Sequence, residues 1–220
     1  PNADDTNRPE RAAIPKKRII IFSPHPDDDV ISMGGTFDRL VEQGHEVHIA
    51  YQTSGNIAVS DEEALKFAEI SLALNPESME PKKLIDFLKR KTDHDIDSLE
   101  MLKLKGLIRR SESLAATRYL GLEDSNVHFL NLPFYETGTV KKNNLSQIDL
   151  DIMYNLIEDI KPHQIYAAGD LADPHGTHKV CLDVLFLALE AIKTKSYMDD
   201  CWVWLYRGAW HEWETYQIEM

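Results

Sequence analysis

The segment RIIIFSPHPDDDV, residues 18–30, decides the fold of this chain. Its first six residues form a short apolar run, which is typical of a parallel strand buried on both faces. A histidine and three aspartates follow directly, and a glycine pair at 34–35 leads into helical spacing over residues 36–43. The segment therefore predicts a buried strand, a polar loop at its carboxyl end and then a helix, which together form the first unit of an α/β sheet.

Outward from this segment, strand and helix patterns alternate along the chain. Further strands are predicted at 45–52, 126–130, 164–168 and 201–206. Helical spacing covers 61–74, 82–91, a longer stretch ending at Gly121, 146–160 and 177–193. The alternation predicts a Rossmann-like α/β fold: a mostly parallel, doubly wound sheet with helices on both faces. Trp202 and Trp204 alternate with Val203 and Leu205, which favours strand core for both tryptophans.

The pattern divides the chain into a tail and one domain. Residues 1–17 contain three prolines and no period, so they are predicted to be a linker or tail, and 18–220 form the domain. A helical insertion of about residues 56–106 brings many charges and no strand. It is either packed on the sheet core, as a lid or oligomer contact, or a solvated helical pair. The start without Met suggests a fragment of a longer polypeptide.

Composition excludes some partners. The formal net charge is −13 and no basic patch dominates, which argues against nucleic acid or an anionic membrane. No apolar run approaches the ~20 residues that span a bilayer, and the polar start does not resemble a signal peptide. Cys181 and Cys201 lack metal-type spacing, so we expect two buried free thiols in a reducing compartment and a cytoplasmic location.

Polar and titratable residues gather where the predicted strands end, which is where ligands of open α/β sheets bind. The segments are 24–29 PHPDDD, 53–56 TSGN, 131–136 NLPFYE and 169–178 GDLADPHGTH. Crowded carboxylates raise one another's pKa unless a cation lies among them. Imidazole together with carboxylate suits Zn²⁺, or another divalent first-row transition metal, better than Mg²⁺. His175 and His178, three residues apart at a helix start, can face the same way.

These segments form an ordered set that resembles the LmbE/PIG-L family of zinc-dependent N-deacetylases. The set consists of 25–28 HPDD, 34–36 GGT, 53–55 TSG, 109–112 RRSE, 120–121 LG and 175–178 HGTH, within roughly residues 18–205. The chain is similar in particular to the deacetylase-like domain fused behind glucosamine-6-phosphate deaminase-like domains in some bacteria. Two departures are Asp29, where the family usually has Glu, and Thr177, where it has Asp.

The resemblance implies residue roles. His25, Asp28 and His178 would bind the metal, and Asp27 would be the general base. His175 would stabilise the oxyanion and protonate the leaving amine. The expected contacts to a small-molecule amino-sugar substrate, an N-acetylglucosamine derivative, are Ser54, Asn56, Arg109, Arg110, Asp173 and Arg207; either Arg109 or Arg110 matches the family's arginine.

Two other functions compete with removal of an N-acetyl group. Asp27 and Asp29, with Asp170 and Asp173 after a later strand, loosely resemble the carboxylate cluster of haloacid-dehalogenase-like magnesium phosphatases. That interpretation gives the histidines no role. The other alternative is a metal-binding domain without activity in a deaminase-like fusion protein. Oligomeric state stays open.

Overall fold

The computed structural model describes residues 15–92, 94–139, 141–169 and 173–208. Its strands form one sheet in the order β3-β2-β1-β4-β5, and every neighbouring pair is parallel. The strands are β1 (Arg18–Ser23), β2 (Glu46–Tyr51), β3 (Val127–Phe129), β4 (Gln164–Ala168) and β5 (Trp202–Tyr206). The five predicted strands are confirmed to within one residue at either end.

The strand order places a switch point beside β1. The chain runs from β1 outward to β2 and β3, and then returns to lay β4 on the other side of β1. Ile19 therefore pairs with Val47 on one side and with Gln164 on the other. In parallel α/β sheets the crevice at such a point, outside the carboxyl ends of the strands, is where ligands bind.

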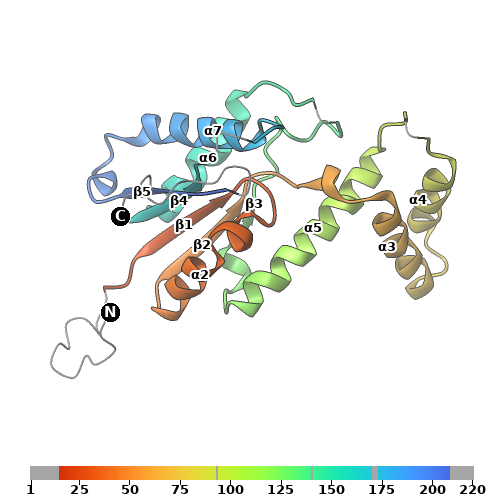
Figure 1. Cartoon of the computed structure of the whole chain (residues 1–220), viewed down its shortest axis with the longest axis horizontal. Coiled ribbons are helices and arrows are strands. Elements are labelled where there is room, and N and C mark those ends of the chain that lie inside the picture. The colour runs from red at the N-terminus through yellow and green to blue at the C-terminus, as the bar shows by residue number, and fades with distance from the viewer. Residues whose placement is uncertain (1–14, 93, 140, 170–172, 209–220) are drawn as a thin grey trace.

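Helices cover both faces of the sheet (Figure 1). On one face, Ile20 and Phe22 share a buried core with residues of α6 (Gln147–Ile160) and α7 (Thr177–Ile192). On the other face, Ile19 and Ile21 pack with Phe37 of α2 (Asp28–Glu42). Both faces of β1 are buried because successive strand residues point to opposite sides. The doubly wound, Rossmann-like prediction is confirmed.

The helix after β1 begins earlier than the pattern predicted. Helical spacing suggested residues 36–43, whereas α2 starts at Asp28 and continues through a kink at Met33, whose φ is −139°. The first turn of α2 is polar, so the apolar spacing that predicts a helix does not appear there. Asp28 and Asp29 nevertheless suit that turn, because the partial positive charge of a helix N-terminus favours carboxylates.

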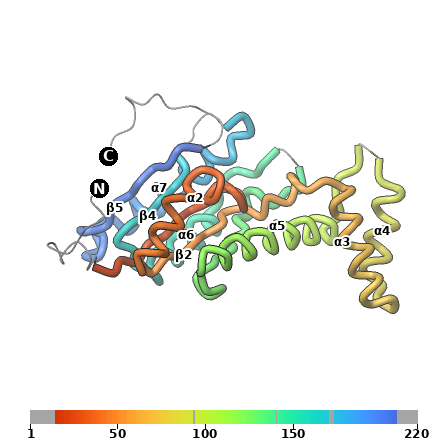
Figure 2. Tube along the Cα trace, turned by 60° about the horizontal axis from the view of Figure 1, so that its bottom comes forward, coloured from red at the N-terminus to blue at the C-terminus, as the bar shows by residue number. Residues whose placement is uncertain are grey.

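The predicted insertion is a helical pair that lies away from the sheet. Helices α3 (Asp61–Leu74) and α4 (Met79–Arg90) pack against each other, and α3 also contacts α5 (Leu99–Tyr119). Both views place the pair beyond the edge of the sheet, beside the start of α5 (Figures 1 and 2). This arrangement favours a solvated helical pair over packing on the sheet core. No boundary falls at residue 106, because α5 runs through it without a break.

Buried charges join this helical pair to the body of the protein. Lys105 of α5 is only 4% exposed, and its ammonium lies 2.7 Å from a carboxylate oxygen of Asp61 and 2.7 Å from one of Asp97. Lys91 pairs with the same two carboxylates. The cluster fixes the start of α3, which directly follows the loop after β2.

Both tryptophans predicted as core are exposed. Trp202 is 66% and Trp204 39% exposed, and their rings stack on each other, whereas Val203 packs on the core beneath α6 and α7. Within the described residues β5 is an edge strand. The face of β5 that carries the two tryptophans is therefore left exposed, although the residues alternate as in a buried strand. Cys181 is a buried free thiol as predicted, and Cys201 is a partly buried one. No described helix has the length and apolarity needed to cross a membrane.

Candidate metal centre and active-site cavity

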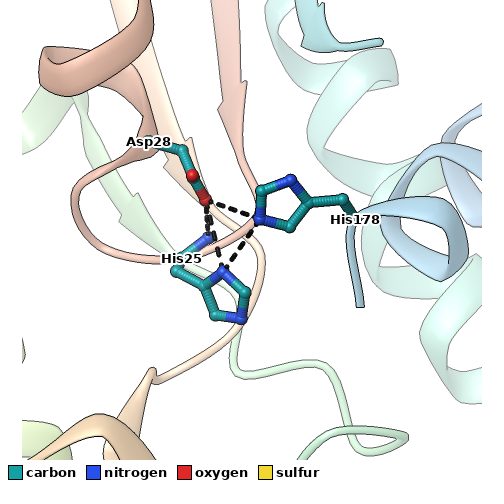
Figure 3. Close-up of side chains that lie close together, drawn as sticks. All are labelled: His25, Asp28 and His178. Atoms are coloured by element: carbon teal, nitrogen blue, oxygen red, sulfur yellow. Dashed lines mark hydrogen bonds and ion pairs between the residues drawn. The ribbon is translucent and has the colours of Figure 1, made fainter. Parts of the chain in front are cut away.

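Three side chains converge at the switch point: His25 from the loop after β1, Asp28 from the start of α2 and His178 from the start of α7 (Figure 3). His25 Nδ1 lies 3.2 Å from His178 Nε2 and 3.3 Å from Asp28 Oδ2, and His178 Nε2 lies 3.3 Å from the same oxygen. In the described part of the chain this is the group of ligand-type side chains close enough to share one metal ion. The two histidines are 153 positions apart, so only the strand order brings them together.

The triangle formed by these three atoms has the dimensions of a zinc site. Tetrahedral zinc bonds of about 2.0–2.1 Å place neighbouring ligand atoms roughly 3.3–3.4 Å apart, which the three distances match. Two imidazoles and one carboxylate suit zinc and its first-row neighbours better than magnesium. Three protein ligands also leave a coordination position open, as in catalytic sites.

Local structure holds Asp28 in its place. The backbone N–H of His25 donates to Asp28 Oδ2 at 2.9 Å, which closes the loop between β1 and α2. Burial alone would raise the pKa of Asp28, but hydrogen bonds and charge from His178 and His25 outweigh burial and hold that pKa well below its usual range. Asp28 is therefore an ionised carboxylate that faces two imidazoles.

Asp173 organises the segment that carries the other two histidines. Its Oδ1 accepts the backbone N–H of His175 and its Oδ2 that of His178, both at 2.9 Å. Gly176 lies between them, directly before the first residue of α7. Its φ is +72°, a backbone conformation that residues other than glycine rarely adopt. Burial opposes ionisation of Asp173, but the two N–H donors outweigh it and lower its pKa. The carboxylate thus sets the start of α7 and the position of His178.

A cavity of about 470 Å³ opens on the candidate metal centre. It is lined by His25, Asp27, Asp28, Ile31, Gly55, Ile57, Ala58, Arg109, Tyr135, Lys142, Asp173, His175, Thr177 and His178. The predicted metal ligands, both predicted catalytic residues and two of the predicted substrate contacts, Arg109 and Asp173, thus line one cavity. His175 is exposed at its wall.

Asp27 lies beside the metal ligands and is paired with an arginine. Arg109 of α5 donates from Nη2 to Asp27 Oδ2 at 2.7 Å and from Nη1 to Glu112 at 3.2 Å. Within the described residues, the other carboxylate oxygen of Asp27 accepts no hydrogen bond. Asp27 is thus oriented through one oxygen and presents the second without a partner.

The remaining predicted substrate contacts lie outside this cavity. Ser54 and Asn56 both donate to the carboxylate of Glu136, at 3.0 Å each. Ser54 and Arg110 line a neighbouring cavity of about 310 Å³, in which the Arg110 guanidinium lies 4.4 Å from the centre of the Phe129 ring. Arg207 is exposed after β5 and lines neither of these two cavities.

Sequence reasoning did not nominate two prominent residues of the cavity. Tyr135 is fully buried and its ring meets that of His25 edge-on, with 5.7 Å between centroids. Lys142 Nζ lies 3.6 Å from the centre of the Tyr135 ring. The polar segment 131–136 was the available signal for Tyr135, since it follows a strand. No pattern marked Lys142, which lies in an irregular loop.

Asp29 faces away from the metal centre. It is fully buried, and Tyr51 donates its hydroxyl to Asp29 Oδ2 at 2.9 Å. Burial raises the pKa of Asp29 to about 6, and the Tyr51 hydrogen bond acts in the opposite direction. The carboxylate cluster of a magnesium phosphatase thus lacks Asp29, and Asp173 is engaged with backbone N–H groups. Asp170 lies outside the described residues.

Fold and site together define a Rossmann-like protein with a candidate catalytic metal centre at its switch point. The chain belongs to the PIG-L family: the family model described as GlcNAc-PI de-N-acetylase matches residues 20–189. The resemblance expected from the motifs is thereby confirmed. It places the chain among proteins related to deacetylases that act on acetylated sugars.

Relatives differ in how much of their length this chain covers. A putative glucosamine-6-phosphate deaminase-like protein of Bacteroides thetaiotaomicron is 54% identical over all of this chain, which spans 35% of that protein. Diacetylchitobiose deacetylase of Thermococcus kodakarensis is 26% identical over 84% of this chain and 72% of its own length. The structure of the 4-carboxy-2-hydroxymuconate hydratase GalB of Pseudomonas putida superposes with a TM-score of 0.52 at 20% identity, over 82% of this chain and 59% of that one. At that identity the likeness concerns the fold alone.

Proposed function

We propose that this domain is a metal-dependent hydrolase that removes the N-acetyl group from an amino sugar of the N-acetylglucosamine type. The observation that carries the proposal is the convergence of His25, Asp28 and His178 on one point, with Asp27 beside them in the same cavity. Family membership supports the reaction type, and the deacetylase from Thermococcus supports an acetylated sugar as the substrate.

In this proposal His25, Asp28 and His178 hold Zn²⁺ or another divalent first-row transition metal. When bound, such an ion lowers the pKa of a coordinated water towards ~7 and polarises the amide carbonyl. The three side chains lie in α2, in α7 or directly after β1. The site is rigid because these three elements are packed in the core.

Asp27 acts as the general base. Its partnerless oxygen accepts the proton of the attacking water, while Arg109 holds the carboxylate through the other oxygen. Since an ion pair with arginine orients the base, Arg109 is a positioning residue for Asp27 in addition to a candidate substrate contact. A base at this position supports an enzyme over a metal-binding domain without activity.

His175 stabilises the developing oxyanion and protonates the leaving amine. It lines the cavity, and Asp173 fixes its backbone next to the metal ligand His178. One good oxyanion donor is worth about 3 kcal/mol of transition-state stabilisation. The products are acetate and the free amino sugar.

The magnesium phosphatase is not favoured, because its cluster would need Asp29, which is buried and bonded to Tyr51. Fusion of this domain to a deaminase-like domain remains a prediction. So do an N-acetylglucosamine derivative as the substrate, an oligomeric state and a cytoplasmic location.

The test combines metal content with product release. We expect near-stoichiometric zinc in the purified protein, its loss in His178→Ala, and acetate release from N-acetylglucosamine compounds that stops when zinc is removed by a chelator and returns when zinc is added. Lys179→Ala, at the exposed next position of α7, is the matched control and should leave both measurements unchanged. Bound metal without acetate release would favour the domain without activity, and failure to bind zinc would refute the site.

A further inference from the structure

The active-site cavity contains a cation that no acidic side chain neutralises. Lys142 is partly buried in the loop between β3 and α6, and it lines the cavity together with the metal ligands. Its ammonium donates to the carbonyl of Thr139 at 2.9 Å and lies over the Tyr135 ring. Within the described residues, no carboxylate oxygen comes within 4.0 Å of it.

The other charges of the cavity are already paired. Arg109 is engaged by Asp27 and Glu112. Burial lowers the pKa of Lys142, and the charge of Glu136 acts in the opposite direction, but the Glu136 oxygens accept hydrogen bonds from Ser54 and Asn56 instead. Within the described residues Lys142 therefore has no carboxylate partner, and partial burial makes a single opposite charge from a ligand count for more there than in water.

The position of Lys142 fits one part of a substrate. Tyr135 contacts both the ammonium and the candidate metal site: its ring centre is 3.6 Å from Lys142 Nζ and 5.7 Å from that of His25. Since Lys142 and the candidate metal ligands line the same cavity, Lys142 is within reach of a substituent on another carbon of a sugar ring whose acetamide lies at the metal site. The ammonium is also held in place by the ring and the carbonyls, so little side-chain freedom is lost when an anion binds.

We propose that Lys142 is a specificity residue that binds an anionic substituent, a phosphate ester or a carboxylate, on the acetylated amino sugar. The substrate class is then acidic amino sugars rather than neutral ones. This inference rests on the proposed deacetylase function and adds the charge of the substrate to it. Lys142 supplies a local positive charge in a chain whose formal net charge is −13 and which would otherwise repel an anion.

Binding of deacetylated probes tests the inference without turnover. The zinc-loaded protein is titrated calorimetrically with three amino sugars. Glucosamine has no acidic substituent, glucosamine 6-phosphate has a phosphate ester, and muramic acid has a carboxylate. We expect one acidic probe to bind at least ~10-fold more tightly than glucosamine, as for one charge-assisted hydrogen bond. Whichever acidic probe shows this preference identifies the anionic group.

The preference should disappear in Lys142→Met, return in part in Lys142→Arg and survive in Lys141→Met. Lys141 is the exposed neighbour, so its replacement makes the same change in net charge as the test variant. Because all variants carry the same zinc, direct anion binding to the metal cancels from the comparison. Equal binding of all three probes by the wild type, or a preference that Lys142→Met retains, overturns the proposal.

Acetate release from the N-acetylated forms of the three probes separates this inference from the proposed function. Release without any preference for an acidic sugar refutes the role of Lys142 and leaves the deacetylase intact. Lys142-dependent binding of an acidic probe without any acetate release refutes the deacetylase and, with it, the acidic substrate.

Discussion

Replacing Asp173 by Asn should weaken zinc binding without unfolding the protein. The carboxylate of Asp173 accepts one backbone N–H from each oxygen, those of His175 and His178, at 2.9 Å each. Asparagine has one accepting oxygen, and its NH₂ group would face the second N–H donor. One of the two hydrogen bonds is therefore lost, and the start of α7 must shift to relieve the contact.

The size of the effect follows from the lost bond. A hydrogen bond to a charged group contributes about 1.5–3 kcal/mol, and a partner left without an acceptor adds to the cost. Displacement of His178 makes this loss fall on the zinc-bound state. The free energy of zinc binding then drops by that amount, and zinc affinity falls roughly 10- to 100-fold. That is also the range found when groups supporting metal ligands are removed.

A competition titration with a chromogenic zinc chelator measures the affinity, and thermal unfolding of the zinc-free protein measures the fold. Asp183→Asn is the control, since Asp183 is partly exposed on the same helix and, within the described residues, pairs only with Lys179. Its zinc affinity should equal that of the wild type. Unchanged zinc affinity in Asp173→Asn would refute the claim that Asp173 positions His178.

Three further outcomes are expected. Asp27→Asn should retain zinc while acetate release falls ~10²- to 10⁴-fold, as for a lost general base; loss of zinc would make Asp27 a ligand. Lys105→Met should lower the free energy of unfolding in denaturant by roughly 1.5–3 kcal/mol, because Asp97 loses one of two charged hydrogen-bond partners and keeps Lys91; a change as small as that of Lys103→Met, on the exposed side of α5, would contradict this. Burial opposes ionisation of Asp61, but its lysine partners outweigh burial and lower its pKa, so its contribution to stability is present above ~4 and lost as pH falls through the lower folded-state pKa. The difference in melting temperature between wild type and Asp61→Asn should therefore shrink from pH 6 to pH 3, and a constant difference would exclude this charge effect.

The secondary structure was largely predictable from the sequence. Strands buried on both faces require continuous apolar runs, so β1 and its neighbours could be identified from local pattern. Where burial was incomplete, the pattern failed: Trp202 and Trp204 alternate as core residues do, yet β5 lies at the edge of the sheet. The first turn of α2 was missed as well. It contains the polar residues of the candidate site, so it lacks the apolar spacing by which a helix is recognised in a sequence.

The candidate ligands could be named from the sequence, but the distances between them could not be derived from it. Spacing along the chain suggested that His25 and Asp28 act together, and resemblance to a family added His178. Only the order of the strands makes a triangle of about 3.3 Å from residues 153 positions apart, because β4 returns to pair beside β1.

What the sequence by itself determined is the class of fold, which depends on residue type and local spacing, and it named a candidate ligand set once the family resemblance was added. The tertiary structure alone decided which groups support them. Asp173 holds the start of α7, Arg109 reaches Asp27 from another helix, and Lys142 enters the cavity from an irregular loop. These roles depend on distances between segments that are remote in the chain, and such distances exist only once the sheet has brought the segments together.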